Sequence, residues 1–191
     1  MKLLLVRHAP TVSTRRAAFS LDESLDEAGT RAAVGLASWL PTRVDRCVSS
    51  PARRALQTAE AAGFVPGLDP DLTECDFGSW AGLTLEEVHA CDPEGLQSWF
   101  RNPEAAPHGG ESLAQMAGRV QGLLDRVCRF DGTIAAFTHA GVIRAAVVVA
   151  LKAPIDSFWR IDIAPLSTTE LHTSGDGWRV VGVNRRWGRA G

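Results

Sequence analysis

The stretch LLLVRHAPT, residues 3–11, joins four consecutive aliphatic residues to an arginine and a histidine. An uninterrupted apolar run is typical of a strand buried on both faces, so we predict a strand over residues 2–6. Arg7 and His8 follow this strand immediately, although both side chains are costly to remove from water. They are either ordinary loop residues or groups that the strand aims into a site, and we favour the site.

Beyond this strand, apolar runs alternate with amphipathic stretches along the chain. The alternation predicts an α/β fold, a three-layer sandwich in which helices flank a mostly parallel central sheet. Further strands are predicted over residues 45–50, 133–138, roughly 159–172 and 177–183. Helices are predicted over residues 25–40, 51–62, 112–129 and 142–152, with a short one after Thr84.

Capping residues mark the predicted helix starts. In a capping box, a Ser or Thr side chain caps the first turn, and a Glu or Gln three residues later bonds back to it. Such pairs are Ser24 with Glu27, Thr84 with Glu87, and Ser112 with Gln115. Another helix is predicted to start with Pro51 at its first position and Ser50 as its cap.

Length, charge and cysteine spacing limit the class of protein. The chain has 191 residues, which fits one domain, and a net charge of −2, so no general positive field attracts nucleic acid. No apolar run approaches the ~20 residues of a membrane span. The four cysteines lack C-x-x-C spacing, which favours free thiols in a reducing compartment. We therefore expect a cytoplasmic protein that binds neither nucleic acid nor membranes.

The region around residues 92–111 is unlike the rest of the chain. It contains three prolines, several glycines and two aromatic residues, Trp99 and Phe100. We interpret it as ordered, because large aromatic side chains need cover and long structureless loops are uncommon. We expect a single domain over residues 1–191, with residues 78–112 as a cap-like excursion over the site.

Three segments leave a predicted strand and at once present polar groups: Arg7 with His8, Ser49 through Arg54, and Thr138 with His139. Ligands of parallel sheets bind at the carboxyl ends of the strands. If these strands are central neighbours, two histidines and two or three arginines meet in one pocket. Helix N-termini after Ser50 and after Thr138 would add backbone N–H groups, so the expected ligand is a phosphate.

Five short motifs resemble those of the histidine phosphatase superfamily, also called the phosphoglycerate mutase-like family, and they occur in the family's order. They are Arg7 to Thr11, similar to R-H-G-x-T; Ser49 to Ala59, which matches S-S-P-x-x-R-A-x-Q-T-A; Leu72 to Glu74 and Gly78 to Gly82, similar to L-x-E and G-x-W-x-G; Gly109 to Ser112, which matches G-G-E-S; and Thr138 to Gly141, which matches S/T-H-x-G. One motif alone occurs by chance, so the resemblance depends on their shared order.

The resemblance implies a role for each of several residues. His8 would be the nucleophile that forms a phosphohistidine, and Glu74 would be the general acid and base. Arg7, Arg54 and His139 would bind the transferring phosphoryl group. Further predicted substrate contacts are Thr11, Thr14, Ala140, Trp80 and His108, with packing as the alternative role for Trp80. No cofactor and no metal are implied.

Elementary chemistry agrees with these implied roles. A nucleophilic imidazole must be neutral, and neighbouring arginine cations disfavour its protonation. Fixed guanidinium groups stabilise the charge of a transferring phosphoryl group without a metal. The leaving oxygen needs a proton, which Glu74 can give, and the same carboxylate can then activate a water molecule.

The chain departs from the family pattern just after Arg7 and His8. Ala9 stands where glycine is usual, which removes the most flexible residue from that turn. Pro10 stands in place of a usual Glu, and Thr14 in place of a frequent Asn. Arg15 and Arg16 either replace lost substrate contacts or belong to an ordinary solvated turn. These departures put the substrate contacts in doubt and leave the chemical core intact.

We therefore predict a metal-independent phosphatase that hydrolyses small phosphomonoesters through a phosphohistidine. The stretch WFRNPEAAPHGGES, residues 99–112, resembles the α-ribazole-phosphatase-like and broad-specificity branches. Candidate substrates are thus α-ribazole phosphate or a sugar or glycerate phosphate. The alternatives are a phosphoglycerate mutase, which returns the phosphate to another hydroxyl, and a non-catalytic phospholigand-binding scaffold. The oligomeric state, including a homodimer, is open.

Overall fold

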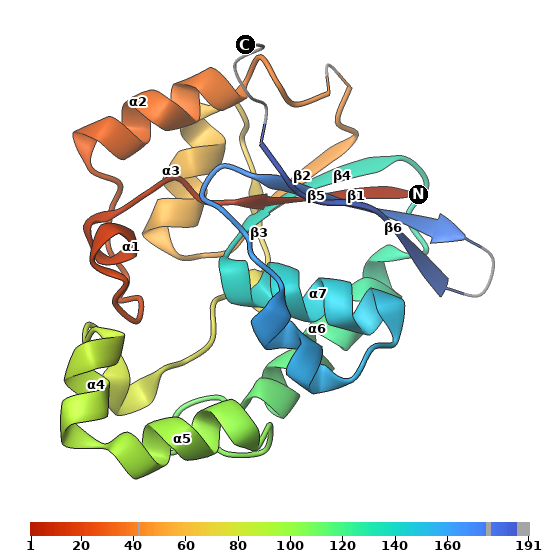
Figure 1. Cartoon of the computed structure of the whole chain (residues 1–191). Helices are drawn as coiled ribbons and strands as arrows, with labels where there is room; N and C mark the ends of the chain where they lie inside the picture. The colour runs from red at the N-terminus through yellow and green to blue at the C-terminus, as the bar shows by residue number, and fades with distance from the viewer. Residues whose placement is uncertain (42, 175–176, 187–191) are drawn as a thin grey trace.

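A six-stranded sheet with helices on both faces forms the centre of the computed structural model (Figure 1), which describes residues 1–41, 43–174 and 177–186. The strand order is β3-β2-β4-β1-β5-β6. The strands are β1 (Lys2–Arg7), β2 (Arg46–Ser49), β3 (Gly67–Leu68), β4 (Thr133–Thr138), β5 (Thr168–Ser174) and β6 (Gly177–Arg185). The predicted three-layer α/β sandwich is confirmed.

The register of the central strands brings their carboxyl ends together. β4 lies between β1 and β2 and runs parallel to both, with Arg7 opposite Thr138 and Ser49 opposite Phe137. β3 is parallel to β2, whereas β5 and β6 are antiparallel to their neighbours. The sheet is therefore mostly parallel, as predicted, and the polar residues after β1, β2 and β4 meet at one edge.

Helices cover both faces of the sheet. They are α1 (Val12–Arg16), α2 (Glu27–Leu36), α3 (Arg53–Ala61), α4 (Leu85–Cys91), α5 (Pro93–Arg101), α6 (Leu113–Val127) and α7 (Ala140–Leu151), with 3-10 turns η1 (Pro70–Leu72), η2 (Gly78–Trp80) and η3 (Ile155–Arg160). In Figure 1, α2 and α3 lie on one side of the sheet and α6 and α7 on the other. Within the described part of the chain, no helix combines the length and apolarity needed to cross a membrane.

The two faces of β1 bury different side chains. Leu3 and Leu5 pack in the larger hydrophobic cluster with residues of α6 and α7, whereas Val6 packs in a second cluster with Leu36 and Phe137. Successive side chains of a strand point to opposite faces. The uninterrupted apolar run thus reflects burial on both faces of the sheet. The run ends where the strand reaches the edge of the sheet and the polar residues begin.

Two of the predicted capping boxes are confirmed, and the predicted caps of two other helices are wrong. Thr84 caps α4 and Ser112 caps α6, each with the expected partner three residues later. The pair of Ser24 and Glu27 does not cap, because α2 begins at Glu27 and the Asp26 side chain accepts the Gly29 N–H. The predicted Ser50 cap is also wrong. α3 begins at Arg53 with Ala52 as its N-cap, and the Ser50 hydroxyl accepts the Ala52 N–H ahead of the helix and contacts His139.

Two segments differ from their predicted structure for tertiary reasons. The strand predicted from about residue 159 begins only at Thr168, because η3 and a loop come first. In that loop the carbonyls of Ile161 and Ile163 accept side-chain N–H groups of Arg144 and Arg7 instead of joining a strand ladder. The region around 92–111 contains α5, which Asp92 caps, and this helix was not predicted.

The segment over residues 78–112, called the cap segment below, has its own small core. Its buried side chains include Trp80, Val88, Leu96 and Trp99, called the cap cluster below. Trp99 also meets Trp159 of η3, with ring centroids 4.8 Å apart. Backbone hydrogen bonds between residue 19 and residues 82 and 83, each 2.8 Å long, tie the segment to the loop after α1. Trp99 is covered, as expected for an ordered region, whereas Phe100 remains 40% exposed.

Candidate active site

Three chain segments bring their polar side chains to one point at the carboxyl edge of the sheet. His8 follows β1, His139 follows β4, and Arg54 lies in the first turn of α3. The two imidazole rings have centroids 5.1 Å apart, and Arg54 Nε donates to His8 Nε2 at 3.3 Å. All three side chains are almost completely buried. The structure therefore places these predicted site residues together.

The hydrogen bonds of His8 define which of its nitrogens is free to react. Nδ1 lies 2.7 Å from the Ala9 carbonyl, which can only accept, so Nδ1 carries the hydrogen. Nε2 then has the lone pair and accepts from Arg54. Burial, aided by the positive charges of Arg54 and Arg7, lowers the pKa of His8 to about 3. At neutral pH the ring is uncharged, and the unprotonated Nε2 faces a guanidinium.

His139 is fully buried and has one nitrogen without a partner. Its Nε2 lies 2.8 Å from Ser50 Oγ, whereas Nδ1 has no hydrogen-bond partner in the protein. Burial, followed by the charge of Arg54, holds the pKa of His139 well below its usual range, so this ring is also neutral. An unpaired polar atom in a protein interior is costly, and a bound ligand would relieve that cost.

Arg7 and Glu74 complete the charged groups at this edge. Arg7 donates to the Ile163 carbonyl at 2.5 Å, and its Nε is buried without a partner. The carboxylate of Glu74 accepts from the Gly141 N–H at 3.3 Å and from the Cys75 N–H at 3.1 Å. Its negative charge raises the pKa of Arg7, although burial has the larger, opposite effect. The carboxylate thus lies within electrostatic reach of the phosphate-binding candidates.

The helix that starts at the site is α7, with His139 at its N-cap and Ala140 as its first residue. The first N–H groups of a helix lack partners within the helix and carry partial positive charge. At the second predicted helix N-terminus, the Arg53 N–H already donates to Asp22 Oδ1 at 2.9 Å. At the start of α7 the Gly141 N–H likewise donates to Glu74, so each of the two helix starts already uses one backbone donor within the protein.

Four of the predicted substrate contacts have partners within the protein. Thr11 and Thr14 form a capping box at the start of α1, with their hydroxyl oxygens 2.8 Å apart. His108 packs against Trp80 in the cap segment, with ring centroids 4.9 Å apart. The His108 Nδ1 accepts the Gly110 N–H, and its Nε2 is buried without a partner. Contact of these residues with substrate remains a prediction.

The departures from the family pattern have local structural explanations. Ala9 is fully buried, and its N–H donates to Thr58 Oγ1 at 3.0 Å. Among the described residues, four non-glycines have positive φ, and Ala9 is not one of them, so the turn does not need glycine here. Arg15 pairs with Asp26, and Arg16 approaches Glu87, both on the surface. These pairs favour a solvated turn over a replacement for substrate contacts.

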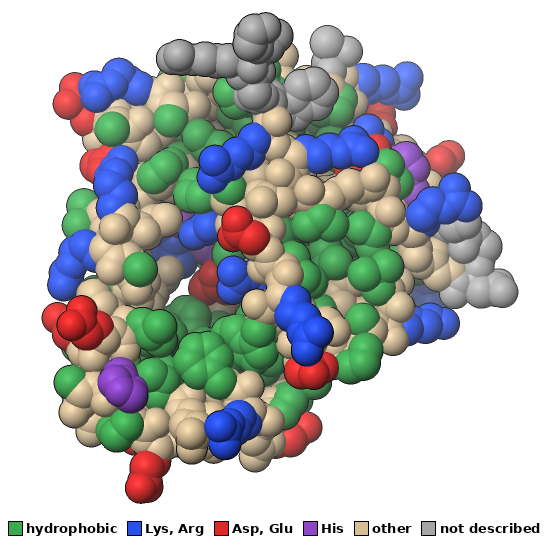
Figure 2. Space-filling model, viewed as in Figure 1, with side chains coloured by type: hydrophobic (Ala, Val, Ile, Leu, Met, Phe, Trp, Pro, Cys, Tyr) green, Lys and Arg blue, Asp and Glu red, His purple; other side chains and the backbone are tan. Residues whose placement is uncertain are grey.

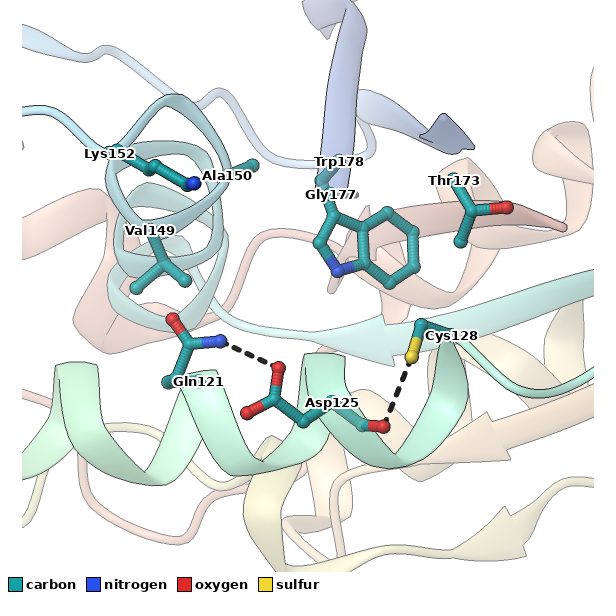
Figure 3. Close-up of a pocket in the computed structure, with 9 residues that line it drawn as sticks. All are labelled: Gln121, Asp125, Cys128, Val149, Ala150, Lys152, Thr173, Gly177 and Trp178. Carbon is teal, nitrogen blue, oxygen red and sulfur yellow. Dashed lines mark hydrogen bonds between the residues drawn. The ribbon is translucent and has the colours of Figure 1, made fainter. Parts of the chain in front are cut away.

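A hollow in the surface separates the α4–α5 lobe from the body of the molecule (Figure 2). Hydrophobic side chains form its lower wall in this view, and charged side chains of both signs lie above them. A separate cavity of about 270 Å³, between α6, the end of α7 and β6, is shown in Figure 3. Lys152 is the only cation among the nine residues drawn there, and α7 carries its position about 20 Å from His139. That cavity lies at the opposite end of α7 from His139 and is therefore distinct from the site at the sheet edge.

The described residues contain no group of three or more His, Cys, Asp or Glu side chains that could hold a metal ion. The four cysteines at positions 47, 75, 91 and 128 are free thiols. At the sheet edge, His8 Nε2 accepts from Arg54, and Glu74 accepts from the backbone N–H groups of Cys75 and Gly141.

A sequence model of the histidine phosphatase superfamily (branch 1) matches residues 3–186. The chain belongs to this family. The match covers β1 from Leu3 onward, the other five strands and every side chain of the site described above. The resemblance inferred from the five short motifs is therefore confirmed.

Curated relatives match most of this chain in sequence. It is 34% identical over 186 residues to a bifunctional protein of Mycobacterium tuberculosis, which covers 91% of this chain and 51% of the relative. The chain thus spans about half the length of the first curated relatives it matches. It is 32% identical to phosphoserine phosphatase 1 of Hydrogenobacter thermophilus, over 90% of this chain and 86% of that protein.

The same fold is present in a mycobacterial glucosyl-3-phosphoglycerate phosphatase solved with VO3. The TM-score is 0.87 at 29% identity, and the alignment covers 97% of this histidine phosphatase and 99% of the other chain. The fold and the strand edge that carries the site are therefore shared along nearly the full length of both chains.

Sequence reasoning missed the polar residues that hold the site residues of this histidine phosphatase. Thr58 Oγ1 accepts from the Ala9 N–H and donates to the Arg54 carbonyl at 2.6 Å, so it joins the β1 turn to α3. Ser50 contacts the ring of His139. Both lie within the motif from Ser49 to Ala59, so the signal was present, but a short polar residue in a motif does not say which distant group it meets.

Proposed function

We propose that this histidine phosphatase is a metal-independent enzyme that hydrolyses small phosphomonoesters through a phosphohistidine on His8. The observation that carries the proposal is the buried, neutral His8 ring with its free Nε2 directed at Arg54 and next to His139. The named relatives, a phosphoserine phosphatase and a glucosyl-3-phosphoglycerate phosphatase, support hydrolysis of phosphate esters.

In the first step, His8 Nε2 attacks phosphorus and the bond to the leaving oxygen breaks. Glu74 donates a proton to that oxygen, so the alcohol leaves neutral. Arg7, Arg54 and the His139 ring stabilise the charge on the phosphoryl oxygens in the transition state. The His8 Nδ1–H, which donates to the Ala9 carbonyl, stabilises the positive charge that the phosphorylated ring gains.

In the second step, a water molecule attacks the phosphohistidine. The Glu74 carboxylate takes a proton from that water, the bond between phosphorus and Nε2 breaks, and inorganic phosphate leaves. His8 is then neutral again and Glu74 is protonated for the next cycle. One carboxyl group thus serves both steps because it gains in one step the proton that it gives in the other.

We also propose the arrangement around this chemistry. Residues 1–191 form one catalytic unit, in which the cap segment covers the site and His108 and Trp80 border the alcohol portion of the substrate. The start of α7 at Ala140, and Thr11 and Thr14 at α1, border the phosphate side. The free thiols are consistent with action in the cytoplasm.

The substrate class is proposed from the relatives' names and from the chemistry of the site. Phosphoserine and glucosyl-3-phosphoglycerate are both phosphate esters that also carry a carboxylate. A panel that contains them, with phosphoglycerates and α-ribazole phosphate, therefore spans the candidates. Inorganic phosphate release from each ester, measured with EDTA present, ranks the substrates and tests independence from metals in the same assay.

Trapping the phosphoenzyme tests the proposal directly. After mixing with a ³²P-labelled ester and rapid quenching, the label should be stable in base, labile in acid, and located on His8. A protein with His8→Asn should retain its fold and incorporate no label. Isomerisation of phosphoglycerate that outruns phosphate release would instead identify a mutase. Tight ester binding with no turnover across the panel would identify a phospholigand-binding scaffold.

A further inference from the structure

Glu74 lies in a segment without regular secondary structure, between η1 and η2. Its carboxylate must nevertheless meet the leaving oxygen within hydrogen-bond reach, and a displacement of about 1 Å can cost about 10²-fold in rate. No helix or strand supplies the backbone order here, so other contacts must hold residues 73–76. These contacts come from α6 and from the loop that precedes it.

One side of the segment is held by Arg119 of α6. Its NH1 nitrogen donates to the Asp71 carbonyl at 2.6 Å and to the Thr73 carbonyl at 3.0 Å. Its Nε and NH2 nitrogens donate to the two carboxylate oxygens of Glu111 at 2.9 and 2.7 Å. The guanidinium thus donates hydrogen bonds to the residue immediately before Glu74 and to Glu111, which lies far along the chain.

The other side of the segment is held by the backbone of Glu111. Its N–H donates to the Asp76 carbonyl at 2.8 Å, and its carbonyl accepts from Cys75 Sγ at 3.2 Å. Its neighbour Gly110 lies so close that an added Cβ would stand 2.1 Å from the Asp76 carbonyl oxygen. Glu111 therefore contacts the two residues that follow Glu74.

The pair of Arg119 and Glu111 forms a bridge over Glu74. The carbonyl before Glu74 is bound by Arg119, the residues after it are bound by Glu111, and the bidentate ion pair joins the two halves. Both side chains are largely buried, with 20% and 18% exposure. Arginine suits this place because its planar group offers several donors in a fixed geometry, which the single ammonium of lysine cannot reproduce.

We propose that Arg119 and Glu111 are positioning residues for Glu74, which hold its carboxyl group where it can transfer a proton to the leaving oxygen. The proposal rests on the proposed function, because it assumes that Glu74 is the proton donor. In the hydrogen bonds and ion pairs of the described residues, neither side chain contacts His8, Arg54 or His139. Their removal should therefore impair the proton transfer and leave the attack by His8 and the binding of phosphate intact.

The leaving group of the substrate separates this role from a purely structural one. An aryl phosphate such as p-nitrophenyl phosphate has a leaving group that departs without a proton, whereas an alkyl phosphate such as phosphoserine needs one. We compare kcat/KM for the two, because this ratio of constants reports the phosphorylation of His8 and excludes the later hydrolysis. In Arg119→Met, kcat/KM for the alkyl ester should fall about 10²-fold, and for the aryl ester less than about 3-fold.

Two further variants sharpen the result. Arg119→Lys keeps the charge but cannot bond the carbonyls and Glu111 together, so we expect an intermediate loss, again confined to the alkyl ester. Glu111→Gln should shift the same selectivity in the same direction. The double variant Arg119→Met/Glu111→Gln should be no worse than Arg119→Met alone, because the two residues act as one unit.

Arg126→Ala is the matched control. Arg126 lies on the same helix and forms exposed ion pairs with Asp69 and Asp71, in the chain just before the Glu74 segment. It reaches neither Thr73 nor the residues after Glu74 in the contacts that the structure describes. Its loss should leave the ratio of the two kcat/KM values unchanged within about 2-fold.

Glu74→Gln separates the failure of this proposal from the failure of the proposed function. If Glu74→Gln lowers kcat/KM equally for both esters, Glu74 is not the acid and the proposed function is wrong at that residue. If Glu74→Gln lowers kcat/KM mainly for the alkyl ester, but the Arg119 variants lower kcat/KM equally for both esters, the positioning role is wrong. Should Arg119→Met unfold at the assay temperature, Arg119→Lys and Glu111→Gln decide the question by the same criterion.

Discussion

The carboxyl edge of the sheet and the cap segment beside it bury different kinds of side chain. At the sheet edge, His8, Arg54 and His139 are hidden from water although each is polar or charged. In the cap segment, the buried side chains include Trp80 and Trp99, which pack with other aromatic rings. Burial of polar groups costs stability and burial of aromatic rings supplies it. Stability and chemistry are therefore separated in space.

The two regions also differ in what positions their side chains. The sheet edge depends on strand register and backbone hydrogen bonds, such as those that pair β1 with β4. The cap segment depends on side-chain packing and on helix caps such as Thr84. We therefore expect substitutions at the edge to lower kcat with the fold intact, and substitutions in the cap cluster to lower stability. Four predictions test this contrast, in order of decreasing effect.

Arg54→Met should have the largest effect. Loss of a guanidinium that stabilises a transferring phosphoryl group should lower kcat about 10⁴-fold. The free energy of unfolding should stay within about 1 kcal/mol, because burial of this charge is costly and lowers the pKa of Arg54. Steady-state kinetics and denaturant unfolding measure both. Arg53→Met, at the exposed neighbouring position, is the control and should leave both values unchanged.

Trp99→Ala should show the reverse pattern. Removal of this ring from the cap cluster should lower the free energy of unfolding by about 3–5 kcal/mol. kcat for a small ester should change less than about 5-fold at a temperature where the variant is folded, whereas KM should rise. Phe100→Ala, at the 40% exposed neighbour, should cost about 1 kcal/mol. A 10³-fold loss of kcat in folded Trp99→Ala would contradict the separation of the two regions.

Gly141→Ala tests how closely Glu74 approaches α7. A Cβ at this position would lie 2.2 Å from Glu74 Oε1, so the carboxylate must move. We expect kcat to fall about 10²-fold, with little loss of stability because alanine favours the helix by about 1 kcal/mol over glycine. Gly118→Ala on α6 is the matched control. A Cβ there meets no atom within 4 Å, so the kinetic constants should not change.

The same contrast explains what the sequence predicts well. The sheet edge is specified by local signals, since an apolar run that ends in Arg7 and His8 marks both the strand and the point at which it stops. Periodicity and capping pairs likewise located α4 and α6. The convergence of His8, Arg54 and His139 then follows from parallel pairing of three strands, which is a general rule of such folds.

Features that depend on distant contacts could not be predicted. The cap cluster forms because aromatic rings from several segments meet, and no local pattern names those partners. The missed helix α5 is a different case, because its start carries local signals, with Asp92 as the cap and Pro93 at the first position. The Ser50 hydroxyl was assigned to a helix cap from its position before Pro51, but it contacts His139, which is 89 residues away. No sequence motif pointed to Arg119. Its role depends on two carbonyl groups and one carboxylate that only the fold brings together.

The dependence of stability on pH is the smallest of the four predicted effects, and it relates the stability of the protein to the chemistry of the sheet edge. His8 has a pKa of about 3 in the folded protein and 6.5 as the ordinary value, so the unfolded chain binds its proton more readily. The contribution of His8 to the free energy of unfolding is therefore fully present above pH 6.5 and is lost as the pH falls toward 3. Between pH 7.5 and pH 5, His8 alone should lower the free energy of unfolding by about 2 kcal/mol.

Denaturant unfolding at pH 7.5 and pH 5 checks this value in the wild-type protein and in His8→Gln. The variant should lose about 2 kcal/mol less than the wild type between the two pH values. His139, whose pKa is lowered mainly by burial and by Arg54 and less by His8, acts in both proteins, so most of its contribution cancels in the difference. The surface carboxylates with lowered pKa, such as Asp26 and Glu87, lose their contribution mainly below pH 5. An equal pH dependence in the two proteins would mean that His8 is solvated or protonated in the folded state, and the site would then lack its neutral nucleophile.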